Sequence, residues 1–77
     1  MTNVFDTAMK FEATQFPNFY KSTNATKDCF VEYVPVVGWV GSYQDAVTLE
    51  GDEDSFLCPT DAIKWLEAQV PFTITLN

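Results

Sequence analysis

The sequence contains no histidine, no arginine and only four lysines. Histidine is the usual acid–base group and a common zinc ligand, and arginine is the usual bidentate ligand of phosphate. The three glycines form no phosphate-binding loop, and the two cysteines, Cys29 and Cys58, form no Cys-x-x-Cys pair. Most groups needed for acid–base, phosphoryl-transfer or zinc chemistry are therefore missing. We expect a protein that is not an enzyme and that uses no cofactor or metal.

Long apolar runs are also missing. No stretch approaches eighteen consecutive apolar residues, and no apolar run follows a basic N-terminal stretch. We therefore expect neither a membrane span nor a signal peptide, and a cytoplasmic protein with reduced cysteines. The glycosylation sequon Asn24-Ala25-Thr26 is then expected to be accidental.

The chain is rich in apolar and aromatic residues. It has 77 residues, 47% of them hydrophobic, with seven phenylalanines, three tyrosines and two tryptophans. Each aromatic side chain can bury about 150–250 Å², so one dense core is possible despite the short chain. We expect a single domain over residues 1–77 that is a monomer or a small homo-oligomer.

The charge is unevenly distributed. Eleven carboxylates against four lysines give a net charge of −7. Residues 1–27 carry +1, whereas residues 28–77 carry nine carboxylates and one lysine, or −8. Nucleic acids and anionic membranes are bound through cations, so neither is an expected direct partner.

Helical spacing of apolar residues predicts a first helix over 4–15, capped by Asn3 and ended by Pro17. The alternative is a strand over Met9–Ala13, where apolar and polar residues alternate. Residues 17–27 predict a loop. A strand is predicted over Asp28–Val34, and a second over 36–40.

The segment Gln44–Val70 predicts a hairpin followed by a helix. Val47 and Leu49 alternate with Ala46, Thr48 and Glu50 in a strand over 46–50, 51–54 supplies a turn, and 55–57 returns. A second helix begins at Pro59, with Cys58 at its cap, and ends before Pro71. Its expected core residues, with those of the hairpin, are Val47, Leu49, Phe56, Leu57, Ile63, Trp65 and Leu66.

Strict alternation over 72–76 predicts a last short strand. The fold class is therefore α+β, with a small antiparallel sheet of four or five short strands. The N-terminal helix and the helix of the C-terminal half pack on one face of this sheet.

Six carboxylates between residues 45 and 61 have no basic residue among them, and we call them the acidic rim: Asp45, Glu50, Asp52, Glu53, Asp54 and Asp61. The rim could be a solvated turn that keeps the protein soluble, or a patch that binds a basic groove of a partner. A divalent-cation site is a weaker alternative because the order of ligands differs from that of an EF-hand. Six unrelieved like charges cost stability, which favours the partner-binding patch.

Two aromatic residues are further candidates for partner binding. Trp39 lies between Gly38 and Gly41, and Tyr43 follows. Tryptophan and tyrosine dominate interface hot spots, but in a small domain they are also common core residues. Cys58 at a helix start could be nucleophilic. Without a histidine base, a structural role is the better interpretation.

This plan of a small acidic α+β chain, with a carboxylate-rich turn and a Cys-Pro-Thr-Asp-Ala-x-x-Trp-Leu helix at 58–66, resembles small phage-encoded inhibitors of bacterial defence, anti-CRISPR proteins among them. The resemblance implies a stoichiometric inhibitor in the cytoplasm of a bacterial host. Its acidic side chains would bind lysines and arginines that otherwise hold DNA or RNA, as a nucleic-acid mimic. The alternative is a structural or assembly subunit that associates through an apolar surface or its C-terminal strand.

Overall fold

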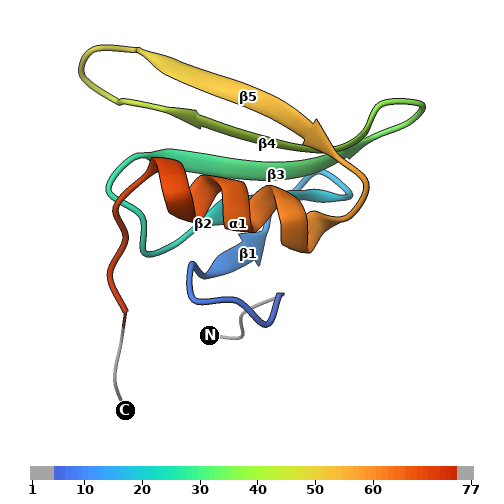
Figure 1. The fold of residues 1–77 in the computed structure, drawn as a ribbon, viewed down its shortest axis with the longest axis horizontal. Coiled ribbons are helices and arrows are strands. Elements are labelled where there is room, and N and C mark those ends of the chain that lie inside the picture. The colour runs from blue at the N-terminus through green and yellow to red at the C-terminus, as the bar shows by residue number, and fades with distance from the viewer. Residues whose placement is uncertain (1–4, 75–77) are drawn as a thin grey trace.

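The computed structural model describes residues 5–74, which form one five-stranded sheet and one helix. The elements in chain order are β1 (Phe11–Ala13), β2 (Phe19–Ser22), β3 (Asp28–Val34), β4 (Gly38–Gln44), β5 (Gly51–Phe56) and α1 (Pro59–Gln69). The strands lie in the order β1-β2-β3-β4-β5, and every neighbouring pair is antiparallel (Figure 1). The predicted sheet and the predicted second helix are thus confirmed.

The helix α1 covers one face of the sheet (Figure 1). Side chains from that face and from α1 form the buried core, which consists of Met9, Phe11, Cys29, Val31, Ala62, Ile63, Leu66 and Val70. The close contact depends on Gly41, since a Cβ there would lie 3.2 Å from the carbonyl oxygen of Ala62. Burial of Cys29 raises the pKa of its thiol to about 11. The opposite face carries the Phe19 and Phe30 rings, with centroids 5.5 Å apart, and a solvated face is common in antiparallel sheets.

The helix begins where its sequence signals predict. Cys58 is the N-cap in extended conformation, with φ −142° and ψ 156°, and makes no side-chain capping bond. Pro59 follows at the first helical position, where its lack of an N–H leaves no donor unsatisfied. The helix ends at Gln69, where the extended Val70 and then Pro71 follow. Among residues 5–74, no helix is long and apolar enough to span a membrane.

The prediction of an N-terminal helix was wrong. Residues 5–9 form bends, and Phe11–Ala13, the last three residues of the alternative strand Met9–Ala13, forms a strand that pairs with β2 (residue 4 lies outside the described part). The amide of Met9 donates to the Glu67 carboxylate at 2.9 Å, which ties this segment to α1. The local capping signal was outweighed because ladder bonds and burial of Met9 and Phe11 favour the extended chain.

The loop predicted over 17–27 was also partly wrong, because it contains β2. Its polar end is an anchor: the side-chain amide of Asn24 accepts a bond from Lys10 N–H at 2.8 Å and donates to the carbonyls of Ala8 and Thr73 at 3.2 and 2.6 Å. Asn24 therefore joins the N-terminal and C-terminal segments. The amide of Asn24 therefore has a structural role.

The hairpin predicted over 46–57 was wrong, because the hairpin in this region is formed by β4 and β5. The predicted turn over 51–54 lies within β5, the predicted strand over 46–50 is the connecting loop, and the strand predicted over 36–40 is β4, which begins at Gly38 and runs to Gln44. The last predicted strand, 72–76, is reduced in its described part to a single bridge between Ala25 and Phe72. Residues 75 and 76 lie outside the described part.

Candidate functional site

Strand β5 is an acidic edge strand. Within residues 5–74 it pairs with β4 on one side only, and Asp52, Glu53 and Asp54 stand in sequence along it, all exposed. A strand rises about 3.3–3.4 Å per residue, so the three carboxylates follow one another at about that axial interval. One strand of B-DNA places its charges at about 3.4 Å along the helix axis. The edge therefore matches the linear charge density of one nucleic-acid strand over this short length.

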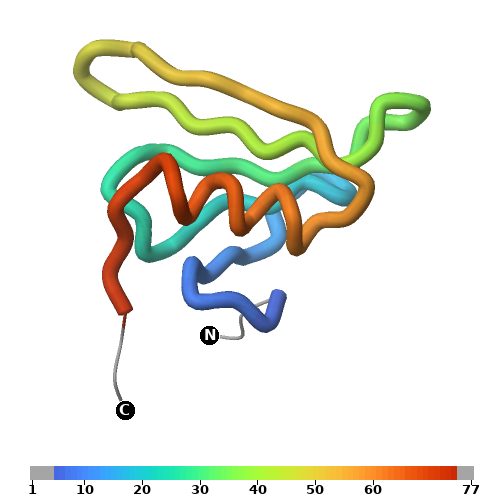
Figure 2. The backbone as a smooth tube through the Cα atoms, in the orientation of Figure 1, coloured from blue at the N-terminus to red at the C-terminus, as the bar shows by residue number. Residues whose placement is uncertain are grey.

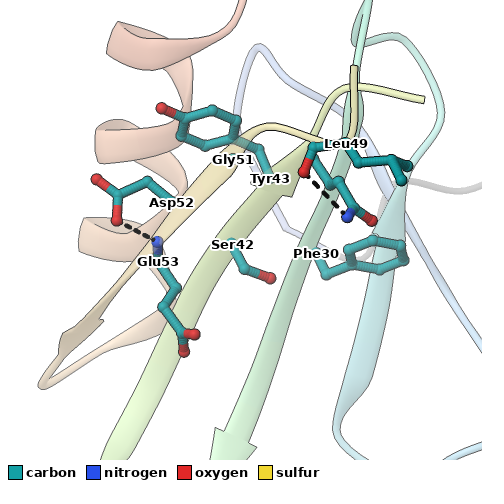
Figure 3. A pocket seen from close by; sticks show the side chains of 8 residues that line it. Phe30, Ser42, Tyr43, Leu49, Gly51, Asp52 and Glu53 are labelled. Atoms are coloured by element: carbon teal, nitrogen blue, oxygen red, sulfur yellow. Dashed lines mark hydrogen bonds between the residues drawn. The ribbon is translucent and has the colours of Figure 1, made fainter. Parts of the chain in front are cut away.

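The carboxylates leave β5 on both sides of the sheet. Asp52 lies on the side of α1, whereas Glu53, which pairs with Ser42, lies on the open side (Figure 3). Asp54, which pairs with Gly41, lies on the same side as Asp52 because it is two residues further along the strand. This alternation follows from the two-residue period of a strand. The charges therefore surround the edge rather than one face of the sheet.

Two of these carboxylates are held in place by the backbone. Asp52 accepts a hydrogen bond from the amide of Glu53, and Asp54 accepts one from the amide of Ser55, each at 2.8 Å. An amide has only one hydrogen, so the amides of Glu53 and Ser55 cannot also donate to β4. They therefore point to the outer edge of β5. Two outward donors of β5, the amides of Glu53 and Ser55, are thus occupied, which disfavours addition of a further strand.

The loop between β4 and β5 is organised by Asp45. Its carboxylate accepts hydrogen bonds from the amides of Val47 and Thr48 at 2.8 and 3.0 Å. Both hydrogen bonds lower the pKa of Asp45 from its usual value, and the bond from Thr48 has the larger effect. Asp45 therefore has a structural role in the turn, and the exposed Glu50 follows it at the start of the acidic edge.

The sixth member of the acidic rim, Asp61, lies in the first turn of α1, where a carboxylate interacts favourably with the helix dipole. It is exposed, but it belongs to a different element from the other five. The structure thus brings the residues from Asp45 to Asp54 together on one hairpin.

Trp39 and Tyr43 are not exposed anchors. Both are partly buried and pack against the core. The Trp39 ring lies 5.5 Å from the Tyr33 ring, and the Tyr43 ring lies 5.8 Å from that of Trp65. The Lys27 ammonium lies 5.6 Å above the Tyr43 ring. Trp39 and Tyr43 are therefore accounted for by packing on the helix side of the sheet.

A wide, shallow hollow of about 450 Å³ lies beside the hairpin (Figure 3). Its lining residues are Phe30, Ser42, Tyr43, Gln44, Leu49, Gly51, Asp52 and Glu53. The side-chain amide of Gln44, one of the lining residues, donates to the carbonyl of Leu49 at 3.3 Å. Within residues 5–74, no three histidine, cysteine, aspartate or glutamate side chains are grouped so that they could hold a metal ion.

The expected core assignment of three hairpin residues was wrong. Val47, Leu49 and Leu57 are 90%, 66% and 97% exposed. Val47 and Leu49 lie in the loop and not in a strand, so their alternation does not correspond to two faces of a sheet. Val36, in the turn between β3 and β4, is also fully exposed. The sequence did not indicate that these residues lie on the surface, because apolar side chains near strands are usually buried.

Comparison of the chain with protein-family models, curated proteins and solved structures found no match.

Proposed function

We propose that this protein is a non-enzymatic binding protein that occupies a basic, nucleic-acid-binding surface of a partner protein. It would act as a stoichiometric inhibitor in the manner of anti-CRISPR proteins. The observation that supports this proposal is the row of carboxylates along the free edge of β5. Their axial spacing of about 3.4 Å per charge suits lysines and arginines arranged to hold one nucleic-acid strand.

Protection of the sheet edge is the competing explanation of the same charges. Natural edge strands are often protected by a single inward charge, a lysine or a short length. In β5, three adjacent carboxylates repel one another, and two of them are already bonded to the outward amides. The third, Glu53, and the neighbouring Glu50 exceed what edge protection needs. This excess favours a binding role.

The test is an edge variant with Glu50→Gln, Asp52→Asn, Glu53→Gln and Asp54→Asn. Asparagine can still accept the amide bonds at 52 and 54, so the fold should be retained. Wild-type protein immobilised in lysate from the native host context should capture a partner that dissociates as salt is raised, because the association is electrostatically steered. The captured partner should lose its bound nucleic acid when the wild-type protein is added at one-to-one stoichiometry.

The control variant carries Asp6→Asn, Glu12→Gln, Asp28→Asn and Glu32→Gln, which changes the net charge equally at positions outside the acidic rim. The edge variant should lose the partner, and the control variant should keep it. Capture by the edge variant with unchanged salt dependence would show that the carboxylates of β5 are not the binding surface.

The alternative function is assembly through an apolar surface, which the exposed Ile74 favours because it lines a second shallow hollow, formed by residues 67–72 and 74. In that case the protein should self-associate with little dependence on salt, and Ile74→Lys should abolish the association. Sedimentation at two ionic strengths separates the two functions.

A further inference from the structure

Exposed apolar side chains stand at both ends of the acidic strand β5. Among the described residues, five of the eight exposed large apolar residues lie there. Val47 and Leu49 are in the loop that enters β5, Leu57 follows its last residue, and Val36 and Val37 form the turn beside that end. Figure 2 shows the loop and the turn at opposite ends of the hairpin edge.

Two of these residues also have unfavourable backbone conformations. Val36 has φ +74° and Leu49 has φ +65°, in the left-handed region that favours glycine. In the described part of the chain, the third residue other than glycine with positive φ is Asn18, a type that tolerates this region. A β-branched residue such as Val36 is an outlier there. The strained apolar pair therefore flanks β5, with one member at each end.

The fold does not need an apolar side chain at either position. Val36 follows Pro35 in a turn closed by the Val37 amide and the Val34 carbonyl at 3.1 Å, a place where glycine is the usual residue. The loop with Leu49 is closed by Asp45 N–H donating to the Glu50 carbonyl at 2.8 Å. Both turns are thus held by backbone bonds, and both side chains face solvent. Strain kept at exposed positions points to a role in binding.

We infer that β5 and its two apolar ends form one continuous docking surface, which fits a protein that carries a row of lysines or arginines bounded at both ends by apolar side chains. The ends should be separated by about 20 Å, the length of a six-residue strand. This inference rests on the proposed function, because the central charges are those of the acidic rim. It adds that the partner contact is apolar at its ends.

The charges select this occupant. A second copy would bring two acidic strands together, and nucleic acid or an anionic membrane has the wrong sign. An added strand is disfavoured because Asp52 and Asp54 occupy the outward amides. The remaining occupant is a basic protein surface, which the side chains of β5 and its ends would contact. The acidic centre then controls association, and the apolar ends slow dissociation independently of salt.

Two synthetic peptides test the inference. Both carry the same central run of lysines, and they differ in their ends, which are leucine and phenylalanine in one and serine in the other. Wild-type protein should bind the apolar-ended peptide about tenfold more tightly by calorimetry, with slower dissociation by surface plasmon resonance. The difference should remain at higher salt, where affinity for both peptides falls.

The variant Val36→Gly with Leu49→Gly should lose this preference while binding the serine-ended peptide as before. The matched control, Phe16→Ser with Ile74→Ser, removes exposed apolar side chains elsewhere and should keep the preference. If the wild type binds the two peptides with equal affinity, the inference that the apolar ends contact the partner is refuted, and the proposed binding role of the acidic residues is unaffected. If the edge variant binds both peptides as tightly as the wild type, or the wild type binds neither, the proposed function fails and the inference fails with it.

Discussion

Replacement of Val36 by glycine should stabilise the protein. The valine has φ +74° and its side chain is 105% exposed, so the substitution relieves the conformation without removing buried surface. The left-handed region costs a residue other than glycine about 1–2 kcal/mol. Glycine gives back about 0.5–1 kcal/mol because it loses more backbone entropy on folding. The net gain should be close to 1 kcal/mol.

For a chain of this size, a gain of about 1 kcal/mol corresponds to a rise in Tm of about 4–8 °C. Thermal unfolding followed by circular dichroism measures the Tm, and guanidinium titration measures the free energy of unfolding. The neighbouring substitution Val37→Gly is the matched control. Val37 has no positive φ, so glycine there brings the entropy cost without the relief and should destabilise the protein.

Two results would refute this reasoning about Val36. One is destabilisation by Val36→Gly as large as that by Val37→Gly, which would mean that the left-handed conformation carries no cost at this position. The other is a stabilisation reproduced by Val36→Ala. Alanine keeps a Cβ and hence most of the left-handed penalty, so it should gain less than glycine.

Three other predictions concern the bonds that hold the chain ends and the loop. Glu67→Ala removes the acceptor of the Met9 amide and should cost about 1–3 kcal/mol in guanidinium unfolding, whereas Glu67→Gln keeps an acceptor and should cost less. Asn24→Asp removes two donors to backbone carbonyls and should lower the free energy of unfolding by about 1–3 kcal/mol; an unchanged value would show that these bonds contribute nothing. The lowered pKa of Asp45 stabilises the fold above its usual value of 3.8, and this contribution is lost as the pH falls through the lowered value. Asp45→Asn should therefore weaken the loss of stability in acid, and an identical pH profile would contradict this role.

Sequence patterns predicted elements whose signals are local. Strand β3 was predicted with its observed bounds because apolar and β-branched residues fill it and Pro35 follows. Helix α1 was predicted because prolines mark both of its limits and its apolar stripe has the helical period. These signals act within one element, so they can be recognised without knowledge of the rest of the chain.

The errors occurred where a distant partner decides the conformation. Strand β1 has only three residues and follows a helix-like capping pattern, and its extended form depends on pairing with β2 and on Glu67, far along the chain. The hairpin turn moved because the side chain of Asp45, six residues before Gly51, closes the loop, whereas Gly51 marked the start of the predicted turn. A turn with glycine and acidic residues is a common pattern, but side-chain capping outweighed it here.

The sequence by itself determined the composition of the chain, the absence of basic residues between 45 and 61, and the limits of the helix that covers the sheet. These depend on residue type and short spacing. Only the tertiary structure decided that Asp52, Glu53 and Asp54 lie along a free edge and that exposed Val36 and Leu57 stand at its end. Edge position and exposure depend on which strands pair and what covers them. Those are long-range contacts, which no local pattern encodes.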